Sequence, residues 1–229
     1  MTAHSVRDDV AVLVPAAGMG VRLGPGAPKA LRTLAGEPLL VHAVRRVAAA
    51  PSVGRIVVAA PPDDVESVVA LLRPVAHVVV VPGGATRQTS VSLALDAVGE
   101  AFPIVLVHDA ARALAPVELI ERVAAAVRDG HEAVVPVLPV VDTIKQVDAD
   151  GRVAGTVDRS VLRSVQTPQG FSRETLVRAH AAAVDEHTDD AGMCEKIGVA
   201  VWTVPGDERA LKITRPLDLE IACLLLDLG

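Results

Sequence analysis

The sequence predicts an α/β protein built on a doubly wound, mostly parallel β-sheet with helices on both faces. Two observations support this prediction. Short runs rich in Val, Ile and Ala are apolar throughout, which is typical of central strands covered on both sides. Amphipathic segments with apolar residues at helical spacing separate these runs. An alternation of strands and helices favours a parallel sheet flanked by helices.

The expected strands span residues 11–15, 56–60, 77–81, 104–107, 133–137 and 199–204. Helices are expected at 65–72, 119–127 and 217–225. In the last of these, the apolar residues Leu217, Ile221, Leu224 and Leu225 follow the spacing of a helix face. Because ligands bind at the carboxyl ends of the strands in such sheets, we expect the functional residues in the loops that follow the strands.

Residues 139–165 depart from this alternation. Extended runs at 143–147 and 152–157 flank an Asp-Gly turn, which is typical of a hairpin. We therefore expect a β-arm inserted after the strand at 133–137, with an ordinary surface hairpin as the alternative. No repeat or interdomain linker is evident, so residues 1–229 are expected to form a single domain.

Composition excludes several classes of partner. The chain carries 22 Lys and Arg against 28 Asp and Glu, a formal charge of −6, so it lacks the basic surface of a nucleic-acid or anionic-membrane binder. The two cysteines have no metal-type spacing. The first ten residues contain no secretory signal, and the apolar runs are too short to span a membrane. These features predict a cytoplasmic protein whose anionic ligands are held by a local cluster of cations.

A glycine-rich loop follows the first strand, at residues 15–29. Small residues let backbone N–H groups approach phosphate oxygens, and basic residues add positive charge beside them. Nucleotidyl transfer needs this charge because the reacting phosphorus gains negative charge. The small residues are Ala16, Ala17, Gly18 and Gly20, and the basic residues are Arg22 and Lys29.

Three other interpretations of this loop are possible. Gly18-x-Gly20 also occurs in dinucleotide-binding turns, but the third glycine and the acidic residue about 20 positions further on are missing. A Walker loop requires a Gly-Lys-Ser/Thr sequence, which is absent. A glycine-rich turn without any ligand is the third alternative, although loops of this kind usually carry function.

Polar and basic residues also follow later strands. Gly84 and Ser90 come after the third expected strand, and Asp109 and Arg112 after the fourth. Without a ligand, Ser90 would be a helix N-cap or an exposed helix hydroxyl. Asp109 and Arg112 would then form a surface ion pair within their loop. Lys212 is expected at the end of a strand.

Further along the chain, Thr143 lies on the expected arm, Arg159 lies just beyond its second strand, and Thr167 precedes a proline. Thr188 is followed by two aspartates, so its alternative role is an N-cap with acidic residues in the first helical turn. Thr214 is expected to cap the last helix, with Pro216 in the first turn.

Taken in order, these motifs resemble one family. The segment PAAGMGVRLG…PKAL resembles the signature of nucleotide-diphospho-sugar pyrophosphorylases. Together with HDAAR, DT-x-K, TPQ, TDD and LKITRP-x-DL, it resembles the 2-C-methyl-D-erythritol 4-phosphate cytidylyltransferases, from about residue 12 to residue 225. The resemblance implies a doubly wound fold, CTP and a polyol phosphate as substrates, release of pyrophosphate, and Mg²⁺ held mainly by the CTP phosphates.

The resemblance also implies roles for individual residues. Catalytic roles fall to Arg22, Lys29 and Lys212, and nucleotide binding to Ala16, Ala17, Gly18, Gly20, Gly84 and Ser90. The acceptor pocket would contain Asp109, Arg112, Thr167 and Thr188. Thr143 and Arg159 would come from the arm of a partner subunit, which implies a homodimer with composite sites.

One residue departs from the family pattern. Many relatives carry an acidic residue at the position of Ala85, so selection of the base would rely more on backbone groups here. A cytidylyltransferase for another polyol phosphate, such as ribitol 5-phosphate, is the nearest alternative. A non-catalytic nucleotide-binding protein and a nicotinamide-dependent oxidoreductase are more distant ones. Retention of Lys29 and Lys212 argues against the non-catalytic protein.

Overall fold

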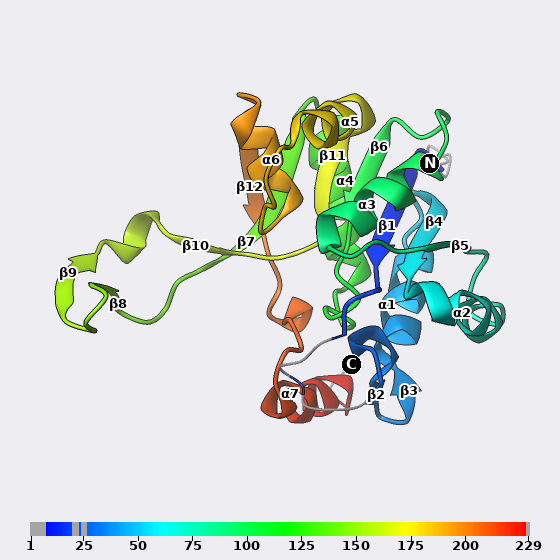
Figure 1. Cartoon of the computed structure of the whole chain (residues 1–229), viewed down its shortest axis with the longest axis horizontal. Helices are drawn as coiled ribbons and strands as arrows, with labels where there is room; N and C mark the ends of the chain where they lie inside the picture. The colour runs from blue at the N-terminus through cyan, green and yellow to red at the C-terminus, as the bar shows by residue number, and fades with distance from the viewer. Residues whose placement is uncertain (1–7, 20–22, 24–26, 228–229) are drawn as a thin grey trace, which may run out of the picture.

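The structure, a computed structural model, describes residues 8–19, 23 and 27–227. Its centre is a sheet with the strand order β10-β7-β11-β6-β1-β4-β5, and β12 also pairs with β7 (Figure 1). The strands are β1 (Val10–Pro15), β4 (Val53–Ala60), β5 (Val79–Pro82), β6 (Ile104–Val107), β7 (Ala133–Pro139), β10 (Arg163–Val165), β11 (Gln169–Ser172) and β12 (Val201–Pro205). Each strand expected from the sequence is therefore present, within a few residues at its ends.

The sheet is mostly parallel, as predicted. β1 pairs in parallel with β4 and β6, β4 with β5, and β12 with β7. β10 and β11 are the antiparallel members. Neither strand was predicted from the sequence, although β11 lies in the middle of the sheet, between β6 and β7. β11 is short and has one large apolar residue, Phe171, so it lacks the apolar pattern of the other strands.

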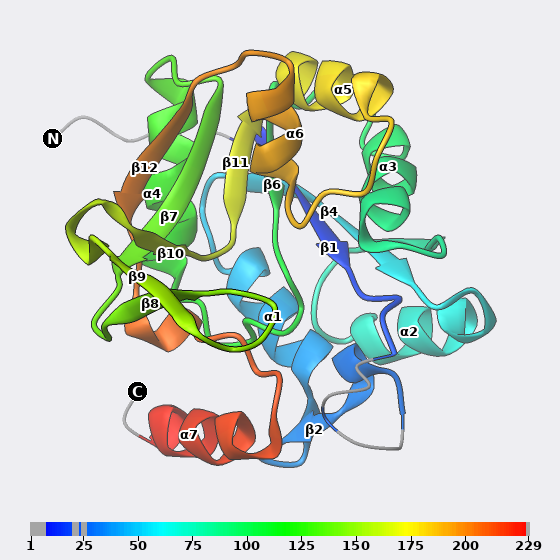
Figure 2. The same ribbon diagram turned by 60° about the vertical axis from the view of Figure 1, so that its left-hand side comes forward.

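Helices cover both faces of the sheet, which explains why the central strands are apolar throughout (Figure 2). In β1, Val12 and Val14 belong to one core, and Ala11 and Leu13 belong to the opposite core. The first core includes α1 (Leu39–Ala48), α2 (Val65–Leu72) and α4 (Val117–Arg128). The second includes α3 (Arg87–Asp96), α5 (Arg173–Ala182) and α6 (Asp190–Lys196). No helix in the part of the chain that the structure describes is long and apolar enough to cross a membrane.

The last helix, α7 (Pro216–Asp227), packs outside the sheet, beside the small hairpin of β2 (Thr33–Leu34) and β3 (Glu37–Pro38). The predicted helix is present, but the prediction of its apolar face was only partly correct. Leu217, Ile221 and Leu224 are exposed, whereas Ala222 is buried in a small core and Leu225 packs against that core. Only one side of α7 meets the protein, so the apolar spacing alone did not identify the side that is covered.

The expected hairpin is formed by β8 (Ile144–Val147) and β9 (Val153–Val157), which pair with each other in a separate sheet. Figure 1 shows this arm extending away from the central sheet between β7 and β10. The carboxylate of Asp148 accepts backbone N–H groups of Asp150 and Arg152 in the turn. Gly151 has a φ of 81°, a backbone conformation that favours glycine. The Asp-Gly signal therefore identified the turn correctly.

Candidate active site

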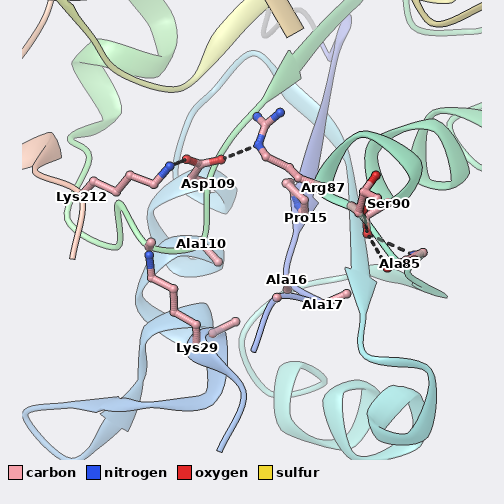
Figure 3. A pocket seen from close by; sticks show the side chains of 15 residues that line it. Pro15, Ala16, Ala17, Lys29, Ala85, Arg87, Ser90, Asp109, Ala110 and Lys212 are labelled. Atoms are coloured by element: carbon pink, nitrogen blue, oxygen red, sulfur yellow. Dashed lines mark hydrogen bonds and ion pairs between the residues drawn. The ribbon is translucent and has the colours of Figure 1, made fainter. Parts of the chain in front are cut away.

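A pocket of about 200 Å³ opens where β1 and β6 end. The chain passes from β1 through β4 to β5 and then returns to β6 on the other side of β1, and ligands bind at such reversals of strand order. Residues after β1, β5 and β6 line the pocket (Figure 3). Of the residues predicted from the sequence, it is lined by Ala16, Ala17, Gly18, Lys29, Gly84, Ser90, Asp109 and Lys212. Gly20 and Arg22 lie outside the described residues.

Different contacts explain why glycine occupies the positions in and next to the pocket. A Cβ added to Gly84 would lie 2.3 Å from Cγ2 of Thr89, and one added to Gly83 would lie 2.6 Å from Cβ of Ala17. Packing within the protein therefore accounts for both glycines. A Cβ on Gly18 would meet no described atom within 4 Å. Gly18 is thus the position where close approach of a ligand best explains the absence of a side chain.

Ser90 fastens the loop that follows β5. Its hydroxyl accepts the N–H of Gly84 at 3.1 Å and donates to the carbonyl of Thr86 at 2.8 Å. The N-cap of α3 is Thr86, whose hydroxyl accepts the N–H of Thr89. Because Ser90 is buried, its alternative role as an N-cap or exposed hydroxyl was wrong.

Asp109 is the only acidic residue among the described residues that line the pocket. Its Oδ1 accepts from Nε of Arg87 at 3.1 Å, and its Oδ2 lies 2.7 Å from Nζ of Lys212. Burial raises the pKa of the Asp109 carboxyl, but the charges of Arg87 and Lys212 outweigh burial and hold this pKa well below its usual range. Asp109 therefore stays ionised at neutral pH.

Arg112 does not form the predicted alternative ion pair within the Asp109 loop. Its Nη1 donates to the carbonyl of Ala210 at 2.7 Å, and its Nη2 donates to the carbonyl of Val165 at 3.1 Å. Its Nε is buried and has no hydrogen-bond partner in the described part of the chain. Arg112 thus fastens the segment that leads to Lys212 onto the loop after β6.

Lys212 does not lie directly at a strand end, so that expectation was wrong. It follows a 3-10 helix, η5 (Glu208–Ala210), which comes after β12. The N–H of Ile213, the next residue, donates to the carbonyl of Ala111 at 2.9 Å. The bonds from Arg112 and Ile213 hold the backbone on both sides of Lys212, and Figure 3 shows its side chain reaching Asp109.

Thr167 lies beneath the loop after β6 and is not among the residues that line the pocket. Its hydroxyl accepts the N–H of Asp109 at 3.0 Å and lies 3.3 Å from Nδ1 of His108. Burial lowers the pKa of His108 to about 4, against the opposing charge of Asp109. His108 is therefore neutral near pH 7 and supports the loop rather than supplying a cation.

The other predicted acceptor residues lie outside the pocket of their own chain. Thr143 and Arg159 are exposed on the arm, and Thr188 is exposed before α6. The N-cap of α6 is Asp189, one residue later than the alternative role of Thr188 required. Thr214 does not cap α7 as expected, because its hydroxyl donates to Asp218, whose carboxylate accepts the backbone N–H of Thr214.

Comparison with known proteins identifies the family. The model of the 2-C-methyl-D-erythritol 4-phosphate cytidylyltransferases matches residues 10–227. The chain belongs to this family. It is 56% identical to the Streptomyces coelicolor protein of that name, over 93% of this chain and 83% of the relative. The Thermus thermophilus cytidylyltransferase has 37% identity and a TM-score of 0.77, with 96% of this chain and 99% of that chain covered.

A structure from Anaerococcus prevotii, described as a 4-diphosphocytidyl-2C-methyl-D-erythritol synthase, has 26% identity and a TM-score of 0.83. It covers 95% of this chain and 98% of its own. These cytidylyltransferases therefore match both the length and the fold of the chain. The resemblance predicted from the sequence motifs is confirmed at the level of the family.

One charged residue that lines the pocket of this cytidylyltransferase was not predicted from the sequence. Arg87 lines the pocket from the first position of α3 and contacts Asp109. A signal for it was present in the sequence. The N-terminus of a helix carries partial positive charge, so an arginine there is unfavourable unless acidic groups lie near. An arginine at the start of a helix that follows a strand therefore indicates acidic partners from elsewhere in the chain.

Proposed function

We propose that this protein transfers the cytidylyl group of CTP to 2-C-methyl-D-erythritol 4-phosphate. The products are 4-diphosphocytidyl-2-C-methyl-D-erythritol and pyrophosphate, in non-mevalonate isoprenoid precursor biosynthesis. One observation carries this proposal within the family: Lys29 and Lys212, which are far apart in the sequence, line a single pocket with Gly18 and Asp109. In Figure 3, Lys29 extends towards the side of the pocket where Lys212 and Asp109 lie.

The geometry favours charge stabilisation over acid–base catalysis. A phosphate oxygen of the acceptor, which is already an anion at neutral pH, attacks the α-phosphorus of CTP. A new P–O bond forms, the bond from the α-phosphorus to the bridging oxygen breaks, and pyrophosphate leaves with that electron pair. The reaction therefore requires no general base. Lys29 and Lys212 would offset the charge that develops on the five-coordinate phosphorus, together with Arg22, whose role stays a prediction.

The residues of the pocket fit a Mg²⁺ ion that is bound mainly by the nucleotide. The described residues contain no cluster of three or more His, Cys, Asp or Glu side chains that could hold a metal. Mg²⁺ at nucleotide sites typically binds substrate phosphates and one or two carboxylates. Asp109 is the carboxylate among the described pocket residues, but both of its oxygens engage cations, so the CTP phosphates would hold the ion, which would supply neutralisation of the triphosphate.

We also propose that the arm completes the site of a partner subunit. Its support is that the arm extends away from the sheet and exposes apolar side chains, with Val141 78% and Val161 76% exposed. Exposed valines in such number on one segment favour burial against another protein surface. Arg159 and Thr143 lie on this arm, so a homodimer would bring them to a second pocket.

A mixing experiment tests the shared site. Arg159→Ala and Lys29→Ala homodimers are each expected to be nearly inactive. In a heterodimer, one pocket combines the intact Lys29 of one chain with the intact Arg159 of the other. Random exchange of subunits at equal concentrations should therefore restore about a quarter of the wild-type activity. Absence of recovery, when mass spectrometry detects the heterodimers, would contradict a site built from two chains.

Pyrophosphate release tests the reaction itself. We expect release that depends on both CTP and 2-C-methyl-D-erythritol 4-phosphate. ATP, GTP and UTP, and ribitol 5-phosphate as acceptor, serve as the comparison substrates. Ala85 lines the pocket, and its methyl group cannot hydrogen-bond to a base, so discrimination between CTP and UTP shows how far backbone groups select the base. Binding of CTP without release of pyrophosphate would contradict the proposal. Faster turnover with ribitol 5-phosphate would indicate that ribitol 5-phosphate is the acceptor.

The cytoplasm is the compartment that we propose for this reaction. Cys194 and Cys223 are both free thiols, as expected in a reducing compartment. Burial raises the pKa of Cys194 to about 12, so this thiol is unreactive at neutral pH.

A further inference from the structure

Arg87 connects three separate parts of the chain at the edge of the pocket. It begins α3, and its Nε donates to Oδ1 of Asp109, in the loop after β6, at 3.1 Å. Its Nη1 donates to Oδ2 of Asp190, the first residue of α6, at 2.7 Å. The guanidinium therefore spans two carboxylates, each through a different nitrogen.

The two carboxylates are unequal partners. The side chain of Asp190 is 0% exposed and that of Asp109 is 10% exposed, whereas that of Arg87 is 27% exposed. A fully buried carboxylate needs a charged partner, so the ion pair with Asp190 fixes the position of the Arg87 guanidinium. Oδ1 of Asp190 lies 3.3 Å from Nε2 of His180 on α5, which engages its second oxygen. Arg87 is thus held on the side away from the pocket by Asp190, which His180 also contacts.

The charged side chains of Asp190, Arg87, Asp109 and Lys212 form a row of ion pairs that leads into the pocket. Because Nε of Arg87 engages one oxygen of Asp109, the other oxygen is directed at Lys212, whose Nζ lies 2.7 Å away. The orientation of the Asp109 carboxylate therefore follows from Arg87, and the position of the Lys212 ammonium follows from Asp109. A displacement of about 1 Å in a catalytic group can cost about 100-fold in rate, so a fixed row matters for charge stabilisation.

We infer that Arg87 is a positioning residue for nucleotidyl transfer: anchored by Asp190, it orients Asp109 and thereby places Lys212. The inference rests on the proposed function, because Lys212 acts there on the α-phosphorus. Lysine does not replace arginine in this position. An ammonium is a point charge, whereas the planar guanidinium holds two carboxylates in fixed relative positions through separate N–H groups.

Arg128 provides a matched control. It lies at the end of α4, donates to both oxygens of Asp9, and its side chain is 24% exposed, close to the value for Arg87. Asp9 precedes β1, so this pair lies at the opposite end of that strand from the pocket. Arg87→Lys and Arg128→Lys therefore each replace a guanidinium that engages carboxylate oxygens through two of its nitrogens, one beside the pocket and one remote from it.

The kinetic experiment measures kcat, KM for both substrates and the Tm of each variant. Arg87→Lys is expected to lower kcat by about 10- to 100-fold, with KM for CTP changed by no more than about threefold. Its Tm is expected to fall further than that of Arg128→Lys, because Asp190 is fully buried and Asp9 is not, so kcat of both variants is measured well below either Tm, where Arg128→Lys keeps its kcat. Guanidinium at low, non-denaturing concentration should raise kcat of Arg87→Ala and leave Arg128→Ala unchanged. A kcat of Arg87→Lys within twofold of wild type overturns the inference.

A second measurement does not depend on turnover, so it separates failure of this inference from failure of the proposed reaction. The chain contains four lysines, Lys29, Lys145, Lys196 and Lys212, so NMR signals of ¹³C-dimethylated lysines are few and assignable by substitution. In Arg87→Gln, the Lys212 signal should move while those of Lys145 and Lys196 stay in place. Arg128→Gln should move none of these three. An unchanged Lys212 signal in Arg87→Gln overturns the inference even if wild-type protein shows no transfer.

Discussion

Lys212→Ala is expected to lower kcat/KM for pyrophosphate release by about 100-fold or more, a loss of about 3 kcal/mol of transition-state stabilisation. The Lys212 side chain lines the pocket, and its ammonium is the group proposed to offset charge at the α-phosphorus. The same loss is expected for Lys29→Ala. Steady-state kinetics with saturating Mg²⁺ measures both.

Lys196→Ala is the matched control for these lysines. Lys196 is exposed at the end of α6 and does not line the pocket, so its kcat/KM should stay near the wild-type value. The fold should survive the loss of Lys212, because Asp109 keeps its ion pair with Arg87. If Lys212→Ala retained kcat/KM within twofold of wild type, the proposed placement of the phosphate would be wrong.

Phe171→Ala is expected to lower the free energy of unfolding by about 3–5 kcal/mol. Phe171 is fully buried in β11, between β6 and β7, and its loss would leave a cavity at the centre of the second core. Urea denaturation measures the change. The matched control is Phe102→Ala, whose ring is only partly buried and lies 5.5 Å from the guanidinium of Arg55. Equal losses for the two variants would contradict a central position for β11.

β11 also shows why part of the fold could not be predicted from the sequence. A Cβ added to Gly170 would lie 2.6 Å from Cγ1 of Val123, because α4 packs directly onto the backbone of this strand. Glycine is required there by a helix far away in the sequence, yet a local interpretation of glycine favours a turn. The strands β1 and β6 were predicted correctly. Both faces of these strands are buried, so nearly every residue in them is apolar and the run is visible in the sequence.

The candidate site also has a part that could be predicted from the sequence and a part that could not. The glycine-rich loop could be predicted because small residues, basic residues and a preceding strand are neighbours in the sequence. The position of Lys212 depends on hydrogen bonds from Arg112 to Ala210 and from Ile213 to Ala111, which join distant segments. The pair of Arg87 and Asp190 is equally non-local. The acceptor roles of Arg112, Thr167 and Thr188, and the arm roles of Thr143 and Arg159, stay predictions.

The loop after β5 has a consequence for affinity. Ser90 and the packing of Gly84 against Thr89 hold residues 84–86 in one shape through contacts within the chain itself. The backbone therefore loses its conformational freedom when the chain folds, and not when a nucleotide arrives. A binding wall that is rigid beforehand leaves more of the interaction free energy available for holding the ligand, and it presents the same shape in every encounter.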